Sequence, residues 1–371
     1  MRAADIGDTW DMAARPGPPS RILIVKLSSL GDIVHAWPVA CSLRASFPQA
    51  RLGWVVERKW LPLIAHHPDV DEVFTVDSLG LRGRPHRWNE LLREVREVRR
   101  FGASAALDLQ GTLKSAFITR ASGAPSRIGF TGTVRREPGA GMAYNVRVEP
   151  HVGHVVEQML DLAETLGPLQ RQARFPFPIP APATAGVERW IEENRIGEFA
   201  FFSPGGGWAS KRWPSERYAA LAEILERRHG LTAVLNRGPG EQNMDDAYRR
   251  ANQIRARLFS GDVEHLGAIL KRARVVVGGD TGPLQLAAAL DVPTVALFGP
   301  TDPARNGPYS PRSHSIVLRK TTETTYQRRS SYSPAMMAIS PEEVAEACGR
   351  LLAESAGSTD AAPPRSAGSR A

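Results

Sequence analysis

The sequence predicts an α/β protein built from two doubly wound, Rossmann-like domains. The chain has 371 residues, which exceeds one typical domain and suffices for two. Short apolar segments alternate with amphipathic segments in both halves, a pattern typical of parallel sheets with helices on both faces. A proline-rich stretch that begins at Phe175, FPFPIPAPATAG, separates the halves and indicates a linker.

The first domain is expected to span residues 21–172. Its predicted strands are, in order, ILIVKL, LGWVVE, EVFTVD and SAALDLQ. The spacing of apolar residues between them predicts helices from Ile33 to Ala45, near Trp60 and around Leu91.

The second domain is expected at residues 187–335, after a linker at residues 173–186. Its predicted strands are EFAFFSP, LTAVLN, RVVVGGD and VPTVALFGP. The predicted helices begin at Val187 and Ser215, lie near Met244, and include the segment LQLAAAL. Ligands of such sheets bind outside the carboxyl ends of the strands, so the two sheet edges are expected to face each other across a cleft.

The ends of the chain are expected to lie outside both domains. Residues 1–20 lack the apolar core of a secretory signal and predict a disordered leader. A final helix is expected at residues 336–352, and the small, polar residues 353–371 predict a disordered tail. No apolar run approaches the roughly 20 residues needed to cross a bilayer.

Composition bounds the possible partners. A net charge of +8 suggests nucleic acid, a phospholipid surface or a phosphorylated substrate, although a bias of the whole sequence toward arginine is the simpler explanation of the total. The two cysteines, Cys41 and Cys348, form no C-x-x-C pair, so neither a disulfide framework nor a zinc site is expected. Four histidines also lack the spacing of metal ligands: His66, His67, His151 and His154.

The turn SSLGD follows the first predicted strand. Gly31 permits a close backbone approach, and Asp32 stands where the next helix begins. Asp32 therefore has two interpretations. It is either a helix N-cap, or a catalytic carboxylate at the sheet edge where ligands bind.

A second turn, SPGGGWASKRWP, follows the first strand of the second domain. Its consecutive glycines free backbone N–H groups to approach an anion, and Lys211 supplies a point charge behind them. The spacing is not that of a P-loop. Phosphate binding is favoured over a plain surface loop because of the position after a strand.

The third turn lies in VVVGGDTGPLQLAAAL, where an apolar strand runs into Gly-Gly-Asp-Thr-Gly. A helix is expected to begin at about Pro283, and its positive N-terminal end predicts an anion site. Asp280 is a poor partner for an anion, so it is expected to accept hydrogen bonds from sugar hydroxyls. The turn FGPTDP, Phe298 to Pro303, lies on the same edge.

Other charged and polar residues have weaker signals. Gln110 and Lys114 lie at another strand-to-helix edge, and Arg135 and Arg136 lie in a loop rich in Gly and Pro; solvated side chains are the default interpretation. No G-x-G-x-x-G follows the first strand, so a nicotinamide dehydrogenase is poorly supported.

Taken together, SSLGD, SKRWP, GGDTGPLQLAAAL and FGPTDP resemble the lipopolysaccharide heptosyltransferases of glycosyltransferase family nine. LSSLGDIVHAWP with the following WVVE resembles the heptosyltransferase I branch. The resemblance covers Ile22 to Leu352 and implies a GT-B fold, two Rossmann-like domains facing across a cleft. It implies transfer of heptose from ADP-L-glycero-D-manno-heptose to Kdo of Kdo-lipid A, with inversion, no cofactor and no bound metal. It also implies a peripheral location on the anionic cytoplasmic face of the inner membrane.

The resemblance also assigns residue roles. Asp32 is implied as the base. The implied donor-binding residues are Gly206, Gly207, Lys211, Thr281 and Gly282 at the diphosphate, Asp280 at the sugar, and Glu241, in the turn RGPGEQ, at the nucleotide ribose. The candidate acceptor-binding residues are Ser29, Gly31, Gln110, Lys114 and Arg136.

The chain departs from the family pattern at two places. Gln285 stands where the family has His in DTG-x-x-H, and it is expected among the donor-binding residues. The Gly206-Gly207 pair stands where the enterobacterial branch has a hydroxyl-bearing pair. Both departures bear on the identity of the donor.

Two alternatives remain open at this point. One is a family-nine transferase that uses another nucleotide-activated sugar. The other is a nonenzymatic nucleotide- or nucleic-acid-binding protein, motivated by the positive charge. No interleaving of aromatic and basic residues supports nucleic-acid binding, so no nucleic-acid partner is expected.

Overall fold

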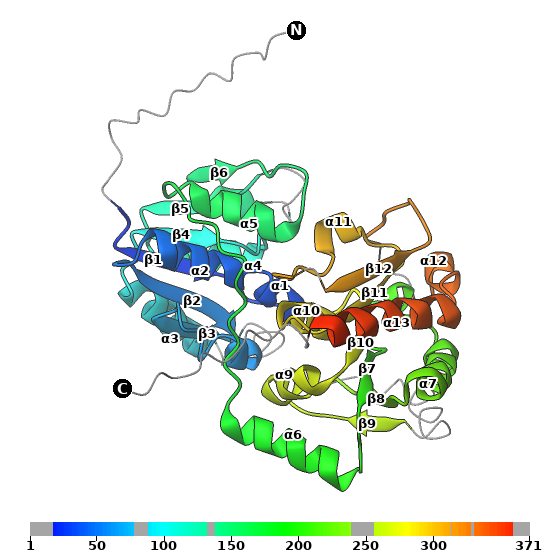
Figure 1. The fold of residues 1–371 in the computed structure, drawn as a ribbon. Coiled ribbons are helices and arrows are strands. Elements are labelled where there is room, and N and C mark those ends of the chain that lie inside the picture. Colours follow the sequence, from blue (N-terminus) through cyan, green and yellow to red (C-terminus); the bar gives the residue numbers. More distant parts are fainter. Residues whose placement is uncertain are drawn as a thin grey trace, which may run out of the picture.

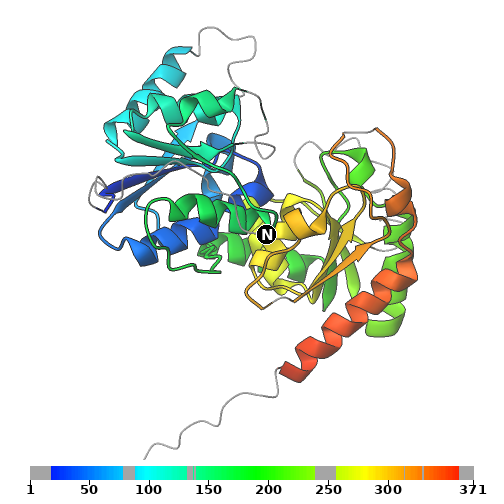
Figure 2. The ribbon, with the colours of Figure 1, turned by 90° about the horizontal axis from the view of Figure 1, so that it is seen from above.

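The structure is a computed structural model and describes residues 18–77, 88–131, 137, 139–238, 256–312, 314–327 and 330–358. It contains two six-stranded sheets, and every strand pair described in them is parallel. Figures 1 and 2 show the two sheets in separate domains that lie side by side. The predicted pair of α/β domains is confirmed.

The N-terminal sheet has the order β3-β2-β1-β4-β5-β6, which is the doubly wound Rossmann order. Its strands are β1 (Arg21–Val25), β2 (Arg51–Glu57), β3 (Glu72–Val76), β4 (Ala105–Asp108), β5 (Ser126–Phe130) and β6 (Val146–Val148). Its helices are α1 (Leu30–Val34), α2 (Trp37–Ser46), α3 (Trp88–Arg100), α4 (Leu113–Ala121) and α5 (Val155–Glu164), with 3-10 turns η2 (Arg58–Leu63) and η6 (Ala140–Ala143).

Alternation along β1 explains why both faces of this sheet are covered. Ile22 and Ile24 are buried in the same cluster as residues of α2 and α5. Leu23 and Val25 are buried with residues of α3 and α4. Successive side chains of a strand point to opposite faces, so a continuous apolar run requires helices on both.

The single helix expected from Ile33 to Ala45 is two helices. The first, α1, ends at Val34, and α2 begins at Trp37 with Pro38 in its first turn. Proline lacks the N–H that a continuous helix would donate to the carbonyl four residues earlier. The break leaves α1 as a separate five-residue helix at the sheet edge. The helix expected near Trp60 is the 3-10 segment η2.

The C-terminal sheet has the order β12-β11-β10-β7-β8-β9. Counted from its own first strand, β7, this is the same Rossmann order. Its strands are β7 (Phe199–Ser203), β8 (Thr232–Asn236), β9 (Arg257–Phe259), β10 (Val275–Gly279), β11 (Thr294–Phe298) and β12 (Ser315–Arg319). Its helices are α6 (Ala181–Glu193), α7 (Ser215–His229), α9 (Val263–Arg272), α10 (Gly282–Ala289), α11 (Pro303–Asn306), α12 (Pro334–Met337) and α13 (Pro341–Ser358), with the 3-10 turn η7 (Ala209–Lys211). The helix expected near Met244 lies outside the described residues.

Two predicted boundaries differ from the structure. Helix α6 begins at Ala181, inside the predicted linker, because Pro182 occupies the first helical turn, where proline is favoured. Helix α13 continues to Ser358, beyond the predicted end at Leu352. It packs on the C-terminal domain through Val344, Cys348 and their apolar neighbours. Within the described residues, no helix is both long and apolar enough to cross a membrane.

Candidate active site

The carboxyl edges of the two sheets meet where α1 contacts α10. Two glycines permit this contact. A Cβ atom on Gly282 would lie 2.8 Å from the Leu30 Cβ, and one on Gly31 would lie 3.1 Å from the Gln285 Cγ. Gly31, predicted among the acceptor-binding residues, therefore lies at a close contact between the two domains.

Asp32 lies in the first turn of α1 and is partly exposed. Its Oδ2 accepts hydrogen bonds from the Ser29 N–H (3.1 Å) and the Ser29 Oγ (2.8 Å). Ser29 is the N-cap residue of α1, so Asp32 is not the N-cap itself. Asp32 is the third helical residue of the capping box and accepts from the N-cap N–H, so it does help to cap the helix start. The same contacts fix the position of the Asp32 carboxylate at the domain interface.

The loop after β4 lies beside the loop after β1. The Ser28 N–H donates to the Oε1 of Gln110 at 3.4 Å, which brings Gln110 next to the turn that carries Asp32. The loop is organised by the buried Asp108, which accepts from the N–H groups of Gln110 and Gly111 at 2.9 Å. Burial raises the pKa of Asp108 above its usual value.

A pocket of about 290 Å³ lies at the carboxyl ends of β2 and β3, and its lining residues are Glu57, Arg58, Lys59, Val76 and Asp77. Lys114 contacts this group, because its Nζ lies 2.9 Å from the Oε1 of Glu57. The Nζ of Lys59 lies 3.7 Å from the other carboxylate oxygen of Glu57. The predicted Lys114 therefore belongs to a charged cluster, and the pocket beside it was not anticipated. Arg135 and Arg136 lie outside the described residues.

Lys211 and Asp280 form an ion pair on the C-terminal domain. The Lys211 Nζ lies 2.6 Å from the Asp280 Oδ2, and both side chains are mostly buried. Thr301 donates its Oγ1 hydrogen to the same oxygen at 3.0 Å, and the Lys211 ammonium lies 4.3 Å from the centre of the Trp208 ring. Thr301 and Trp208 were not singled out from the sequence, although both lie in turns that were.

The glycine loop lies against the start of α10. A Cβ atom on Gly206 would be 3.6 Å from the Thr281 Cγ2, whereas one on Gly207 would meet no described atom within 4 Å. The guanidinium of Arg212 holds the loop by donating to the Gly206 carbonyl at 2.7 and 2.9 Å. The structure thus brings together the second and third predicted motifs.

Thr281 is the N-cap residue of α10, and Pro283 follows in the first turn. The Oγ1 of Thr281 is buried and has no hydrogen-bond partner among the described residues. Backbone N–H groups at a helix start, together with the positive end of the helix dipole, attract anions. The unpaired hydroxyl and the helix start at Gly282, with Lys211 nearby, are the features that favour the predicted anion site.

Gln285, which is predicted to contact the donor, is held by two contacts within the protein. It is buried, its Nε2 donates to the Asn306 carbonyl at 2.8 Å, and its Oε1 accepts from the Nε2 of His35 at 3.0 Å. Both amide atoms therefore have protein partners, and one partner belongs to the other domain. The structure favours an interdomain role for Gln285. Glu241, the predicted ribose ligand, lies outside the described residues.

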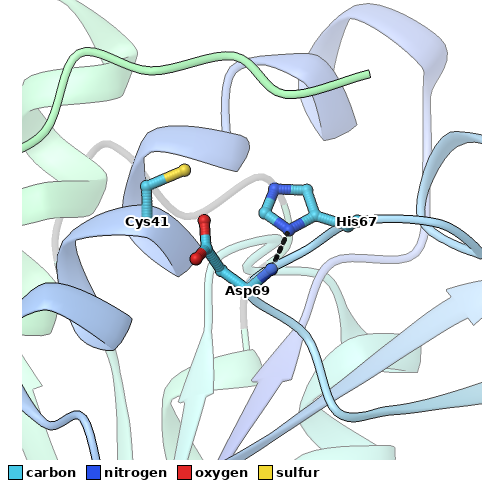
Figure 3. A group of neighbouring side chains, drawn as sticks. All are labelled: Cys41, His67 and Asp69. Carbon is cyan, nitrogen blue, oxygen red and sulfur yellow. Dashed lines mark hydrogen bonds between the residues drawn. The ribbon is translucent and has the colours of Figure 1, made fainter. Parts of the chain in front are cut away.

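Three side chains with metal-binding atoms gather beneath the interdomain linker (Figure 3). The sulfur, nitrogen and oxygen atoms of Cys41, His67 and Asp69 all lie within 4.8 Å of one another. The Asp69 N–H donates to the His67 Nδ1 at 3.2 Å, so the neutral ring carries its hydrogen on Nε2. The Arg174 guanidinium lies 3.8 Å from the Asp69 carboxylate.

Burial sets the protonation of this cluster. It lowers the pKa of His67 to about 4, which keeps the imidazole neutral, and raises the pKa of the Cys41 thiol above its usual value. A metal ligand presents a deprotonated thiolate and an imidazole lone pair, so a cation here would have to displace the thiol proton. The Cys41 Sγ donates to the Arg174 carbonyl at 3.6 Å, whereas the buried His67 Nε2 and Asp69 Oδ2 have no hydrogen-bond partner among the described residues.

With this geometry established, comparison with known proteins identifies the family. A family model described as glycosyltransferase family 9 (heptosyltransferase) matches residues 91–336. The chain belongs to glycosyltransferase family 9. It is therefore a glycosyltransferase, which contradicts the alternative of a nonenzymatic binding protein.

Relatives within family 9 match over most of the chain. Lipopolysaccharide heptosyltransferase 1 of Pseudomonas aeruginosa is 31% identical over 306 residues, which cover 78% of this chain and 81% of that protein. Lipopolysaccharide heptosyltransferase 1 of Escherichia coli K12 is 28% identical and covers 82% and 94%. These matches agree with the resemblance to the heptosyltransferase I branch.

Solved structures of family 9 proteins have the same two-domain GT-B architecture. A family 9 glycosyltransferase of Veillonella parvula superposes with a TM-score of 0.75 at 23% identity, over 90% of this chain and 97% of that one. The E. coli heptosyltransferase WaaC with ADP superposes with a TM-score of 0.68 at 25% identity, over 89% and 99%. The predicted GT-B fold is confirmed.

Proposed function

We propose that this glycosyltransferase transfers heptose from ADP-L-glycero-D-manno-heptose to a Kdo residue of Kdo-lipid A, with inversion and without a bound metal ion. The single observation that carries the proposal is the meeting of the Asp32 helix with the anion site at Thr281 and Lys211. The relatives named lipopolysaccharide heptosyltransferase 1 support the substrate class, as does a solved WaaC structure with ADP-2-deoxy-2-fluoro heptose.

The donor diphosphate is assigned to the C-terminal domain. Lys211, the glycine loop and the Thr281 hydroxyl surround one region at the start of α10. Their positive potential would stabilise the charge that develops on the departing ADP, without a divalent cation. Asp280 would accept hydrogen bonds from sugar hydroxyls while it keeps Lys211 in place.

Asp32 is assigned as the general base. Its carboxylate is partly exposed and is held by Ser29, so it is able to take a proton from an acceptor hydroxyl that enters from the N-terminal domain. In a single displacement the acceptor attacks the anomeric carbon opposite to the departing diphosphate. The base is assigned to one domain and the leaving group to the domain that faces it. This arrangement would place the two groups on opposite sides of the anomeric carbon, as an inverting reaction requires.

The acceptor is assigned to the N-terminal domain. The pocket at Arg58 and Lys59, with Lys114 at its margin, also contains Glu57 and Asp77. Its three cations pair with Glu57 and Glu94 in the structure, and on acceptor binding they would exchange these partners for the carboxylate of Kdo or the phosphates of lipid A. The overall charge of +8 would favour a peripheral position at an anionic membrane surface, which we place at the cytoplasmic face of the inner membrane.

The proposal is tested with purified protein, ADP-heptose and Kdo-lipid A in the presence of EDTA. Mass spectrometry should detect a product that carries one added heptose, and NMR of the new linkage should show inversion at the anomeric carbon. Transfer that stops in EDTA and returns with a divalent cation would refute the metal-independent mechanism. A family 9 enzyme for another donor would ignore ADP-heptose and consume a different nucleotide sugar in a competition assay.

A further inference from the structure

We propose that His35 and Gln285 form a positioning pair that holds helix α1, and with it Asp32, against α10. The catalytic consequence rests on the proposed function, in which Asp32 is the base. The pair itself is an interdomain hydrogen bond between residues 250 positions apart in the chain. Neither residue is assigned a contact with a substrate.

The hydrogen-bond directions in this pair are determined by its neighbours. The Gln285 Nε2 donates to the Asn306 carbonyl, so the Oε1 of the same amide faces His35 as an acceptor. The His35 Nε2 must therefore carry a hydrogen and donate it. Burial, followed by the nearby His154, lowers the pKa of His35 to about 3, so the ring is neutral and the donor is maintained at working pH.

Two more hydrogen bonds between the domains lie beside this pair. The His154 Nδ1 accepts from the Val156 N–H at 3.2 Å, so its Nε2 donates to the Gly307 carbonyl at 3.0 Å. The Tyr309 hydroxyl donates to Glu157 of α5. The His35 and His154 rings meet edge to face with centroids 5.3 Å apart, which joins the contacts into one interdomain cluster.

The length of α1 explains why this cluster acts on Asp32. The helix has five residues, and His35 is its C-cap residue. Ser29 holds the Asp32 carboxylate within the first turn of α1. The Ser28 N–H ties the start of this helix to Gln110 of the N-terminal domain, and the His35 side chain ties its end to the C-terminal domain. Because both ends of so short a helix are fixed, the carboxylate cannot shift without breaking one of these contacts.

The test combines two measurements on Gln285→Leu, His35→Leu and the double variant. Hydrogen–deuterium exchange without any substrate should show faster exchange at residues 31–35 in each variant. Turnover should fall by roughly 10- to 100-fold, the cost of a misplaced catalytic group, while ADP affinity measured by calorimetry stays within about twofold of wild type. The turnover of the double variant should be no lower than that of either single variant, because all three variants lose the same hydrogen bond between His35 and Gln285.

Two variants control for loss of a buried polar group. His35→Gln keeps an N–H donor near the position of Nε2 and should retain most turnover. Gln158→Leu removes a glutamine that is equally buried and donates to the carbonyls of His151 and Gly153 inside one domain. It should cost stability without faster exchange in α1. If Gln285→Leu does not fold, the shorter amide of Gln285→Asn is measured in the same way.

Other outcomes would overturn the proposal. If Gln285→Leu weakened ADP binding and left hydrogen–deuterium exchange in α1 unchanged, Gln285 would be a ligand of the donor. If exchange in α1 and turnover were both unchanged, Gln285 would have no positioning role. The exchange measurement needs no substrate, so it separates this inference from the proposed function. A wild-type enzyme that fails to transfer heptose refutes the function, whereas unchanged exchange in α1 refutes the positioning pair.

Discussion

At the scale of single residues, the structure replaces isolated motifs by pairs. Asp32 is held by Ser29, and Lys211 is held by Asp280. All four residues are candidates from the sequence. The structure adds that Ser29 fixes the position of the Asp32 carboxylate and that Asp280 balances the charge of Lys211. Residue substitutions therefore have to be designed so that the partner remains satisfied, because an unpaired buried charge costs more than the interaction is worth.

Asp32→Asn should separate catalysis from folding. Asparagine keeps an oxygen that accepts from Ser29, but it cannot take a proton, and a positioned general base contributes roughly 10²–10⁴-fold. We expect a melting temperature near that of wild type, unchanged ADP affinity and turnover reduced by at least about 100-fold. Turnover near the wild-type rate would limit Asp32 to the structure of the SSLGD turn.

His35 predicts a pH dependence of stability. Its pKa is lowered from 6.5 to about 3 by burial and then by His154, with Asp32, Gln285 and Lys26 as the other groups that act on it. Below pH 6.5 the unfolded chain binds a proton that the folded protein does not, so stability is lost as the pH falls toward 3. At about pH 5 the free energy of unfolding is lower by about 2 kcal/mol than at neutral pH because of this one histidine.

His35→Gln removes this titration and keeps a donor. Between about pH 7.5 and about pH 5, its unfolding free energy in urea should therefore fall by about 2 kcal/mol less than that of wild type. Parallel pH profiles of the two proteins would contradict a neutral, buried His35.

At the scale of elements, the site depends on two short helices that approach each other closely. The break at Pro38 frees α1 from α2, and glycines at both contact points let α1 lie on α10. Neither Gly31 nor Gly282 has a positive φ angle. These positions therefore require glycine because the two helices approach closely, and not because of the backbone conformation.

Gly282→Ala should disturb this contact. The added Cβ would lie 2.8 Å from the Leu30 Cβ, closer than real contacts allow, so α1 has to move. We expect turnover to fall by roughly 10- to 100-fold, since small displacements of catalytic groups are costly. Gly197→Ala is the control, because a Cβ there meets no described atom within 4 Å. Equal turnover of the two variants would show that the helix contact tolerates displacement.

At the scale of the whole molecule, the linker is packed between the domains. The Ser42 Oγ accepts from the Gln172 N–H at 2.8 Å, which holds the chain along α2. Phe177 stacks on Trp37 with ring centroids 5.5 Å apart, and a Cβ on Gly267 of α9 would lie 2.5 Å from its ring. One buried apolar cluster consequently contains residues of both domains. A linker packed in this way couples the two domains through buried contacts.

Phe177→Ala should therefore destabilise the protein as a whole. Removing a buried phenylalanine typically costs about 3–5 kcal/mol, and this ring contacts both domains. Urea unfolding should show a loss of that size, and small-angle scattering should show a larger radius of gyration. Phe117→Ala, at a side chain that is 51% exposed on α4, should change stability by less than about 0.5 kcal/mol. Similar effects of the two substitutions would contradict a packed linker.

Much of this protein could be predicted from its sequence because the signals are local. Apolar runs bounded by turns predict the strands, and glycine-rich loops after strands predict the sheet edges that carry Asp32, Lys211 and Asp280. Parallel sheets bring the carboxyl ends of neighbouring strands to one edge, so the motifs could be grouped before any contact was known. The family could be recognised from the same short segments.

Other features depend on contacts between distant residues and required the tertiary structure. The partner of Gln285 lies 250 positions away, and the residues beside Lys211 and Asp280 that complete their cluster, Trp208 and Thr301, are ordinary in their local sequence. The proline-rich stretch also reads as a free linker, although its phenylalanines are buried between the domains. Local pattern determines which segments become strands, helices and turns. Only packing determines which side chains meet, because hydrogen-bond partners are selected by proximity in space.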